Sequence, residues 1–124
     1  MRAALAQYGL GDHADRLPDG LTPFQLRLLE LARAEISEAR LLLLDEPAAG
    51  ATEEEAGTLG DIIARHLLPS RSVILIEHRM DLLARLCSEI LVLQAGRTLA
   101  HGAARHVFSQ PSVRACLLGE PAHA

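Results

Sequence analysis

A run of four leucines at residues 41–44, followed at once by Asp45, Glu46 and Pro47, constrains this chain more than any other feature. An apolar run without alternation is typical of a strand whose two faces are both covered, as in a parallel α/β sheet. Pro47 has no N–H to donate to a neighbouring strand, so we expect the strand to end before it. Two acids at the end of a buried strand suit the binding of Mg²⁺ and the orientation of a water beside a nucleotide phosphate. The alternative is an ordinary strand followed by a turn.

Two further apolar runs, at residues 73–76 and 90–93, predict two more strands of the same kind. Residues 53–68 carry apolar side chains at helical spacing behind an acidic first turn, and Thr52 is a suitable N-cap for that helix. Residues 79–88 predict a second helix, between the second and third runs. Apolar strands that alternate with helices of this length form β-α-β units, so the sequence predicts an α/β fold with a parallel sheet.

Turn residues and helical spacing predict the other elements of the chain. Pro23 is suited to the first turn of a helix, and Gly96 to a hairpin turn. The elements predicted in this way are helices at residues 2–8, 24–36, 103–109 and 111–119, a hairpin turn at 94–97 and a short strand at 98–101.

Composition argues against several classes of function. The net charge is −4 and the basic residues, all arginines, are scattered singly, which argues against a nucleic-acid surface. No apolar run approaches the roughly 18 residues of a membrane-spanning helix. Cys87 and Cys116 lie in apolar patterns with no metal-like or redox-like spacing, so we expect buried, reduced thiols in a cytoplasmic protein.

Three motifs follow one another in a distinctive order. The segment LTPFQ at residues 21–25 opens a helix, DEP at 45–47 ends one predicted strand, and IEH at 76–78 ends the next. This order resembles the second half of an ABC-type ATPase domain. The motifs match its signature helix, its Walker B strand with the catalytic glutamate, and its switch histidine.

Longer matches narrow the resemblance to one subfamily. The segments DEPAAG at residues 45–50, IEHRM at 76–80 and PSVRACLLGE at 111–120 resemble the ATP-binding subunits of branched-chain amino acid importers. The resemblance implies the C-terminal half of a P-loop NTPase (RecA-like) parallel sheet flanked by helices. Its segments would be part of the helical subdomain at residues 1–36, the α/β core at 37–102 and a helical tail at 103–124.

The resemblance also implies a role for individual residues. Asp45 would hold Mg²⁺ through water, Glu46 would polarise the attacking water as a general base, and His78 would contact the γ-phosphate of ATP. The alternative for His78 is a strand-end histidine bonded to the backbone. Thr22 and Gln25 would provide a weak, degenerate signature contact to ATP.

The chain departs from the family in three places. No G-x-x-x-x-G-K-[ST] loop occurs in it, and it contains no lysine, although that loop cradles the phosphates in the family. Pro23 and Phe24 stand where the family signature has small or glycine residues, so we expect weak or no signature contact. Ala51 and Thr52 replace the usual Leu and Asn or Asp of the loop that crosses the dimer interface.

These observations leave more than one function open. The resemblance implies part of the ATPase subunit of an importer of branched-chain amino acids or similar solutes. Its partners would be membrane permease subunits and a second ATP-binding subunit, at the cytoplasmic face of the cell membrane. One alternative is a truncated, degenerate remnant of such a subunit. The other is a regulatory half that pairs with an intact ATPase subunit. In either case the chain would not bind or hydrolyse ATP by itself. Without the P-loop we expect the isolated chain to be inactive, to bind no Mg-ATP and, with unpaired apolar strands, to self-associate.

Overall fold

The computed structural model describes residues 2–118 of the chain. Its contacts divide the chain into two compact units, residues 1–78 and 79–124. The three segments that the resemblance implies, with boundaries at residues 36 and 102, stay a prediction. The helix predicted at 111–119 ends at Leu118, and its expected terminal residue, Gly119, lies outside the described residues.

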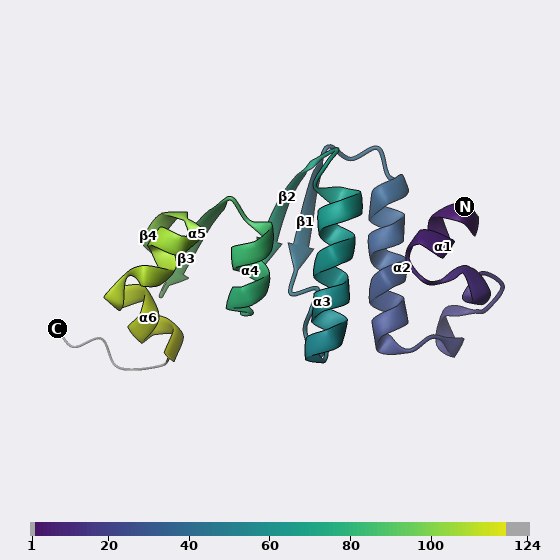
Figure 1. The fold of residues 1–124 in the computed structure, drawn as a ribbon, viewed down its shortest axis with the longest axis horizontal. Helices are drawn as coiled ribbons and strands as arrows, with labels where there is room; N and C mark the ends of the chain where they lie inside the picture. Colours follow the sequence, from purple (N-terminus) through teal and green to yellow (C-terminus); the bar gives the residue numbers. More distant parts are fainter. Residues whose placement is uncertain (1, 119–124) are drawn as a thin grey trace. The chain divides into compact units, whose positions relative to one another are not determined.

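The first unit is built from helices and two strands (Figure 1). Polar caps begin its two long helices, because Thr22 and Thr52 each accept a hydrogen bond from the backbone N–H three residues on, in a capping box. The predicted cap at Thr52 is therefore confirmed. The elements in chain order are α1 (Arg2–Gln7), η1 (Gly11–His13), η2 (Pro18–Gly20), α2 (Pro23–Ile36), β1 (Leu41–Asp45), α3 (Glu53–Ile62), the π-helical turn η3 (Ile63–Leu67) and β2 (Ser72–Ile76).

Strands β1 and β2 form a parallel pair joined by α3 and η3, so the predicted β-α-β unit is confirmed. In the register of this pair, Leu43 lies beside Ile74 and Asp45 lies beside Ile76. The α/β fold class with a parallel sheet is confirmed as well. Parallel strands begin at one edge and end at the other, so the residues that follow β1 and β2 come to the same edge.

The prediction that β1 and β2 are covered on both faces is wrong for the described residues. The face that contains Leu42 is the inner one, since Leu42 is only 8% exposed. On the opposite face Leu43 is 71% exposed and Ile74 is 53% exposed. An uninterrupted apolar run predicts two covering layers, and the described residues bury only one face of this pair.

In its described residues, 79–118, the second unit contains an antiparallel hairpin and three helices (Figure 1). The predicted hairpin turn is confirmed: Ala95 and Gly96 both have positive φ, as a two-residue turn of this kind requires. Val107 and Val113 are fully buried and form part of its core. The elements are α4 (Met80–Leu86), β3 (Glu89–Gln94), β4 (Arg97–Ala103), α5 (Ala104–Ser109) and α6 (Pro111–Leu118).

Strand β3 also differs from the expectation for a strand of a covered parallel sheet. Its pairing in the described residues is antiparallel, with β4, and Leu91 and Leu93 are more than half exposed. The alternation of exposed and buried residues is that of an antiparallel hairpin with one solvated face. The exposed apolar side chains of β3 therefore form a surface that the other described residues do not cover.

The structure also bears on the expected burial of the two cysteines and on membrane-spanning helices. Cys87 and Cys116 are free thiols, as expected, but both are half-buried rather than buried. Partial burial raises the pKa of the Cys87 thiol. Over residues 2–118, no helix is both long enough and apolar enough to span a bilayer.

Candidate functional site

The carboxyl ends of β1 and β2 bring two of the predicted site residues together. Glu46 follows β1 directly, and His78 stands two residues beyond the end of β2. The imidazole Nε2 of His78 lies 2.7 Å from the carboxylate Oε1 of Glu46, which is a hydrogen-bonding distance. The His78 side chain is 83% exposed and the Glu46 side chain 44% exposed, so the pair can be reached from solvent. A general base and a phosphate-contacting histidine would need this access.

The backbone of Glu46 adopts an uncommon conformation. Its φ of 46° lies in the left-handed region, which costs a non-glycine residue on the order of 1–3 kcal/mol. The Glu46 N–H donates to the carbonyl of Ile76 over 2.8 Å, and the Ala49 N–H donates to the carbonyl of Glu46 over 3.0 Å. These bonds hold the turn in place and direct the Glu46 side chain toward His78.

A third acid at this edge, Glu77, was not identified as a site residue from the sequence. Its Oε1 accepts a hydrogen bond from the Ala48 N–H at 2.9 Å, and its Oε2 accepts one from the His78 N–H at 3.1 Å. The carboxylate thus connects the loop after β1 to the peptide of His78. The only signal in the sequence was an acid directly before the histidine at a predicted strand end.

Asp45 is the last residue of β1, and it is exposed. In the part of the chain that the structure describes, no three His, Cys, Asp or Glu side chains are grouped so that they could hold a metal ion by themselves. Protein sites for Mg²⁺ often supply only one or two carboxylates and leave the other positions to waters and substrate phosphates. The exposed carboxylate of Asp45 fits such a partial site and does not form a complete one.

The signature-like residues Thr22 and Gln25 already bond to each other. The Thr22 Oγ1 accepts from the Gln25 N–H at 3.1 Å, and the Gln25 Oε1 accepts from the Thr22 N–H at 3.0 Å. The Gln25 amide nitrogen also lies 2.9 Å from the Nε2 of His13. Both side chains therefore serve the start of α2, and a ligand would have to compete with these bonds. The weak signature contact to ATP stays a prediction.

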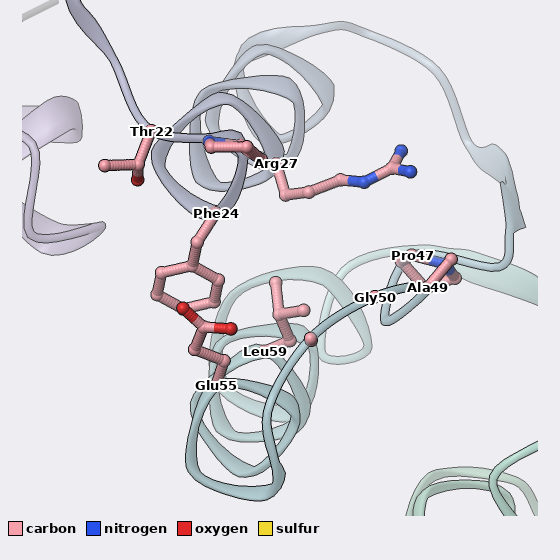
Figure 2. Close-up of a pocket in the computed structure, with 10 residues that line it drawn as sticks. Thr22, Phe24, Arg27, Pro47, Ala49, Gly50, Glu55 and Leu59 are labelled. Carbon is pink, nitrogen blue, oxygen red and sulfur yellow. The ribbon is translucent and has the colours of Figure 1, made fainter.

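A pocket of about 340 Å³ lies beside the start of α2. Its wall is formed by residues from the first two turns of α2 and α3 and from the loop at residues 47–51 that follows Glu46. Figure 2 shows Phe24 pointing from α2 toward Glu55 of α3, while Arg27 extends toward the side where Pro47 and Ala49 lie. The aromatic ring of Phe24 thus occupies space that a glycine would leave open.

No family model matches the chain. Individual known proteins do match it, and they are of the class that the order of the motifs resembles. The chain is 35% identical over 117 residues to the high-affinity branched-chain amino acid transport ATP-binding protein LivG of Escherichia coli K12, a match that covers 94% of this chain and 46% of LivG. It is 36% identical over 117 residues to BraF of Pseudomonas aeruginosa, which carries the same description, with the same coverage of 94% and 46%. The nickel import ATP-binding protein NikO of Rhodobacter capsulatus is 38% identical over 115 residues, which cover 89% of this chain and 44% of NikO.

A solved structure agrees with these relatives. The ADP conformation of an ATP-binding cassette of an ABC transporter superposes with a TM-score of 0.82 at 25% identity, covering 95% of this chain and 48% of that one. The chain spans about half the length of the curated relatives that it matches. The chain therefore belongs to the family of ATP-binding proteins of ABC transporters.

Proposed function

We propose that this chain provides the Walker B and switch-histidine part of the ATPase subunit of an importer for branched-chain amino acids or similar solutes. The observation that carries the proposal is the 2.7 Å contact between Glu46 and His78 at the carboxyl edge of β1 and β2. In open α/β sheets, ligands bind outside the carboxyl ends of the strands. The relatives named for branched-chain amino acid transport support the choice of solute.

The proposed roles follow from the chemistry of phosphoryl transfer. That reaction depends on positioning and on charge neutralisation around the transferred phosphate. Asp45 would hold Mg²⁺ through water, and the ion would neutralise charge on the phosphates of ATP. Glu46 would accept a hydrogen bond from the attacking water and orient it. His78, held by Glu46, would donate a hydrogen bond to the γ-phosphate.

The proposed ATPase needs a phosphate-binding loop that residues of this chain do not provide. The chain has no P-loop motif and no lysine to reach the phosphates. The exposed apolar face of β1 and β2, with Leu43 and Ile74, is suited to cover by a further layer of protein. We infer that a P-loop-bearing polypeptide segment supplies both the loop and this layer.

The remaining partners follow from the same proposal. An importer ATPase works with membrane permease subunits and a second ATP-binding subunit. We place the protein at the cytoplasmic face of the membrane, where ATP is available. The relatives described as transport and import ATP-binding proteins support this assembly.

The test is reconstitution of hydrolysis from two halves. The chain is mixed with the P-loop-bearing half of Escherichia coli LivG, and release of phosphate from Mg-ATP is measured. We expect hydrolysis only in the mixture, and we expect Glu46→Gln to abolish it because an amide cannot act as the base. Glu38→Gln, which makes the same change at an exposed position in the loop before β1, is the control.

Two results would contradict the proposal. A mixture that forms a complex without hydrolysing ATP would favour the degenerate remnant or the regulatory half. Undiminished turnover in Glu46→Gln would remove Glu46 from the role of base.

A further inference from the structure

We propose that Glu77 is a positioning residue for this site: its carboxylate holds the Glu46 loop and the His78 peptide together, so that the Glu46–His78 pair keeps its geometry. The inference rests on the proposed function of that pair. It concerns a residue that the family resemblance does not single out, and it is carried by two hydrogen bonds. These run from the Ala48 N–H to Glu77 Oε1, at 2.9 Å, and from the His78 N–H to Glu77 Oε2, at 3.1 Å.

The loop after β1 needs such an anchor because of its backbone. Glu46 has a φ of 46°, a conformation that persists only when surrounding contacts hold it. One contact precedes Pro47, where the Glu46 N–H donates to the carbonyl of Ile76 over 2.8 Å. The other follows Pro47, where the Ala48 N–H donates to Glu77. The loop is therefore fixed to the end of β2 on both sides of the proline.

The chemistry of the two bonds requires a carboxylate. Each oxygen of an ionised carboxylate accepts hydrogen bonds, and bonds to a charged acceptor are roughly twice as strong as neutral ones. A glutamine at position 77 would offer only one acceptor oxygen, and its NH₂ group would face a second N–H donor. The structure thus predicts that Glu77→Gln keeps at most one of the two bonds, and that Glu77→Ala loses both.

The first experiment measures amide hydrogen exchange by NMR in the complete chain. In Glu77→Ala we expect the amides of Ala48 and His78 to exchange at least roughly tenfold faster than in the wild type, since each loses a hydrogen bond to a charged acceptor and a tenfold change corresponds to about 1.4 kcal/mol. In Glu77→Gln we expect faster exchange at one of the two amides at least. Glu38→Gln, a matched change at an exposed acid, should leave both rates unchanged.

The second readout is the ring resonances of His78 at one fixed pH. If Glu77 positions the pair, Glu77→Gln and Glu77→Ala should move these resonances in the same direction as Glu46→Gln, because in each variant His78 loses its contact with the Glu46 carboxylate. Glu77→Gln preserves the size of the side chain, so it remains informative if Glu77→Ala fails to fold. Urea denaturation of each variant separates this local effect from a loss of global stability.

The outcomes separate this inference from the proposed function. Unchanged exchange at both amides in Glu77→Ala would show that Glu77 does not connect the Glu46 loop to the His78 peptide. Unchanged His78 resonances in both variants would overturn the positioning role. In the reconstituted ATPase, we expect Glu77→Gln to lower kcat about tenfold while the KM for ATP is unchanged, because a displaced base affects the chemical step. An unaltered kcat would also overturn the positioning role. An inactive wild-type mixture would overturn only the proposed function, since exchange and resonances are measured without ATP.

Discussion

At the scale of single residues, two positions have backbone conformations that their residue types do not favour. Among the described residues that are not glycine, Glu46 and Ala95 have positive φ, at 46° and 48°. At Glu46 the strained conformation accompanies a contact between its carboxylate and His78, the pair to which we assign the proposed function. At Ala95 it serves only the turn between β3 and β4. The unfavourable φ of Glu46 thus lies in the candidate site, whereas that of Ala95 lies in a hairpin turn.

We expect Ala95→Gly to raise the free energy of unfolding by about 1 kcal/mol. Glycine adopts positive φ without steric cost, and this gain exceeds the entropy that glycine loses on folding. The measurement is urea denaturation. The matched control is Ala100→Gly in β4, where the alanine is buried and its φ is ordinary, and where we expect a loss of similar size. Destabilisation by Ala95→Gly would contradict the assignment of strain to this turn.

Tyr8 gives a pH-dependent prediction. Burial raises the pKa of its hydroxyl, and the nearby carboxylate of Glu35 adds to the rise, while Arg71 opposes it. Above the ordinary tyrosine pKa of about 10, the unfolded chain releases the Tyr8 proton and the folded chain keeps it. The free energy of unfolding should therefore fall as pH rises above about 10.

The measurement for Tyr8 is urea denaturation at several pH values between about 9 and 11. Tyr8→Phe should reduce the fall, because it removes the proton that the folded state retains. The thiol of Cys87, whose pKa is also raised, contributes with the same sign in both proteins and cancels in the comparison. Equal pH slopes in wild type and Tyr8→Phe would show that Tyr8 is not responsible.

At the scale of elements, capping determines where the helices that flank the site begin. Helix α3 starts at Glu53 because Thr52 and Glu55 exchange hydrogen bonds across its first turn, at 3.2 and 2.9 Å. The same helix leads away from the loop that carries Glu46. The local sequence is sufficient to form this cap, since all its atoms lie within four consecutive residues.

We expect Thr52→Ala to lower the free energy of unfolding by about 1 kcal/mol, because it leaves an N–H of the first turn without its side-chain partner. The control is Thr58→Ala, an identical change at an exposed position inside the same helix. There the substitution should be neutral or slightly stabilising, since alanine is the better helix former. Equal effects at the two positions would contradict a specific capping role.

At the scale of the whole molecule, the uncovered apolar face of the β1–β2 pair determines whether the chain self-associates in solution. Leu41, Leu43, Ile74 and Ile76 are each more than half exposed on one face of the β1–β2 pair. Contiguous exposed apolar surface of this kind marks an interaction site, and unpaired strand edges favour association. The surface is a reason to expect a covering partner in the cell, and self-association when that partner is absent.

We expect the isolated chain to sediment as oligomers at micromolar concentration, and Leu43→Ser to shift it toward monomer. The loss of stability should be below about 1 kcal/mol, because most of the Leu43 side chain is already in water. Leu42→Ser on the inner face is the control, and it should destabilise the fold by several kcal/mol. A wild-type chain that is monomeric at micromolar concentration would contradict this prediction.

Much of this molecule follows from its sequence because the signals are local. The strand that ends before Pro47, the cap at Thr52 and the turn at Gly96 each depend on residues within a few positions of one another. The family resemblance, which rests on the order of the motifs, also implied that Asp45, Glu46 and His78 serve one site. The structure confirms the parallel pair and shows a contact between Glu46 and His78, while the roles of the three residues stay predictions.

Only the tertiary structure shows which surfaces are covered and which groups meet. Glu77 bonds to Ala48 across 29 positions, and His78 contacts Glu46 across 32, so no local pattern contains either contact. The positive φ of Glu46 arises from the bonds that hold its loop, which is why its own residue type does not reveal it. Likewise, four leucines in a row determine a strand, but whether its second face is buried depends on which other protein segment packs against it.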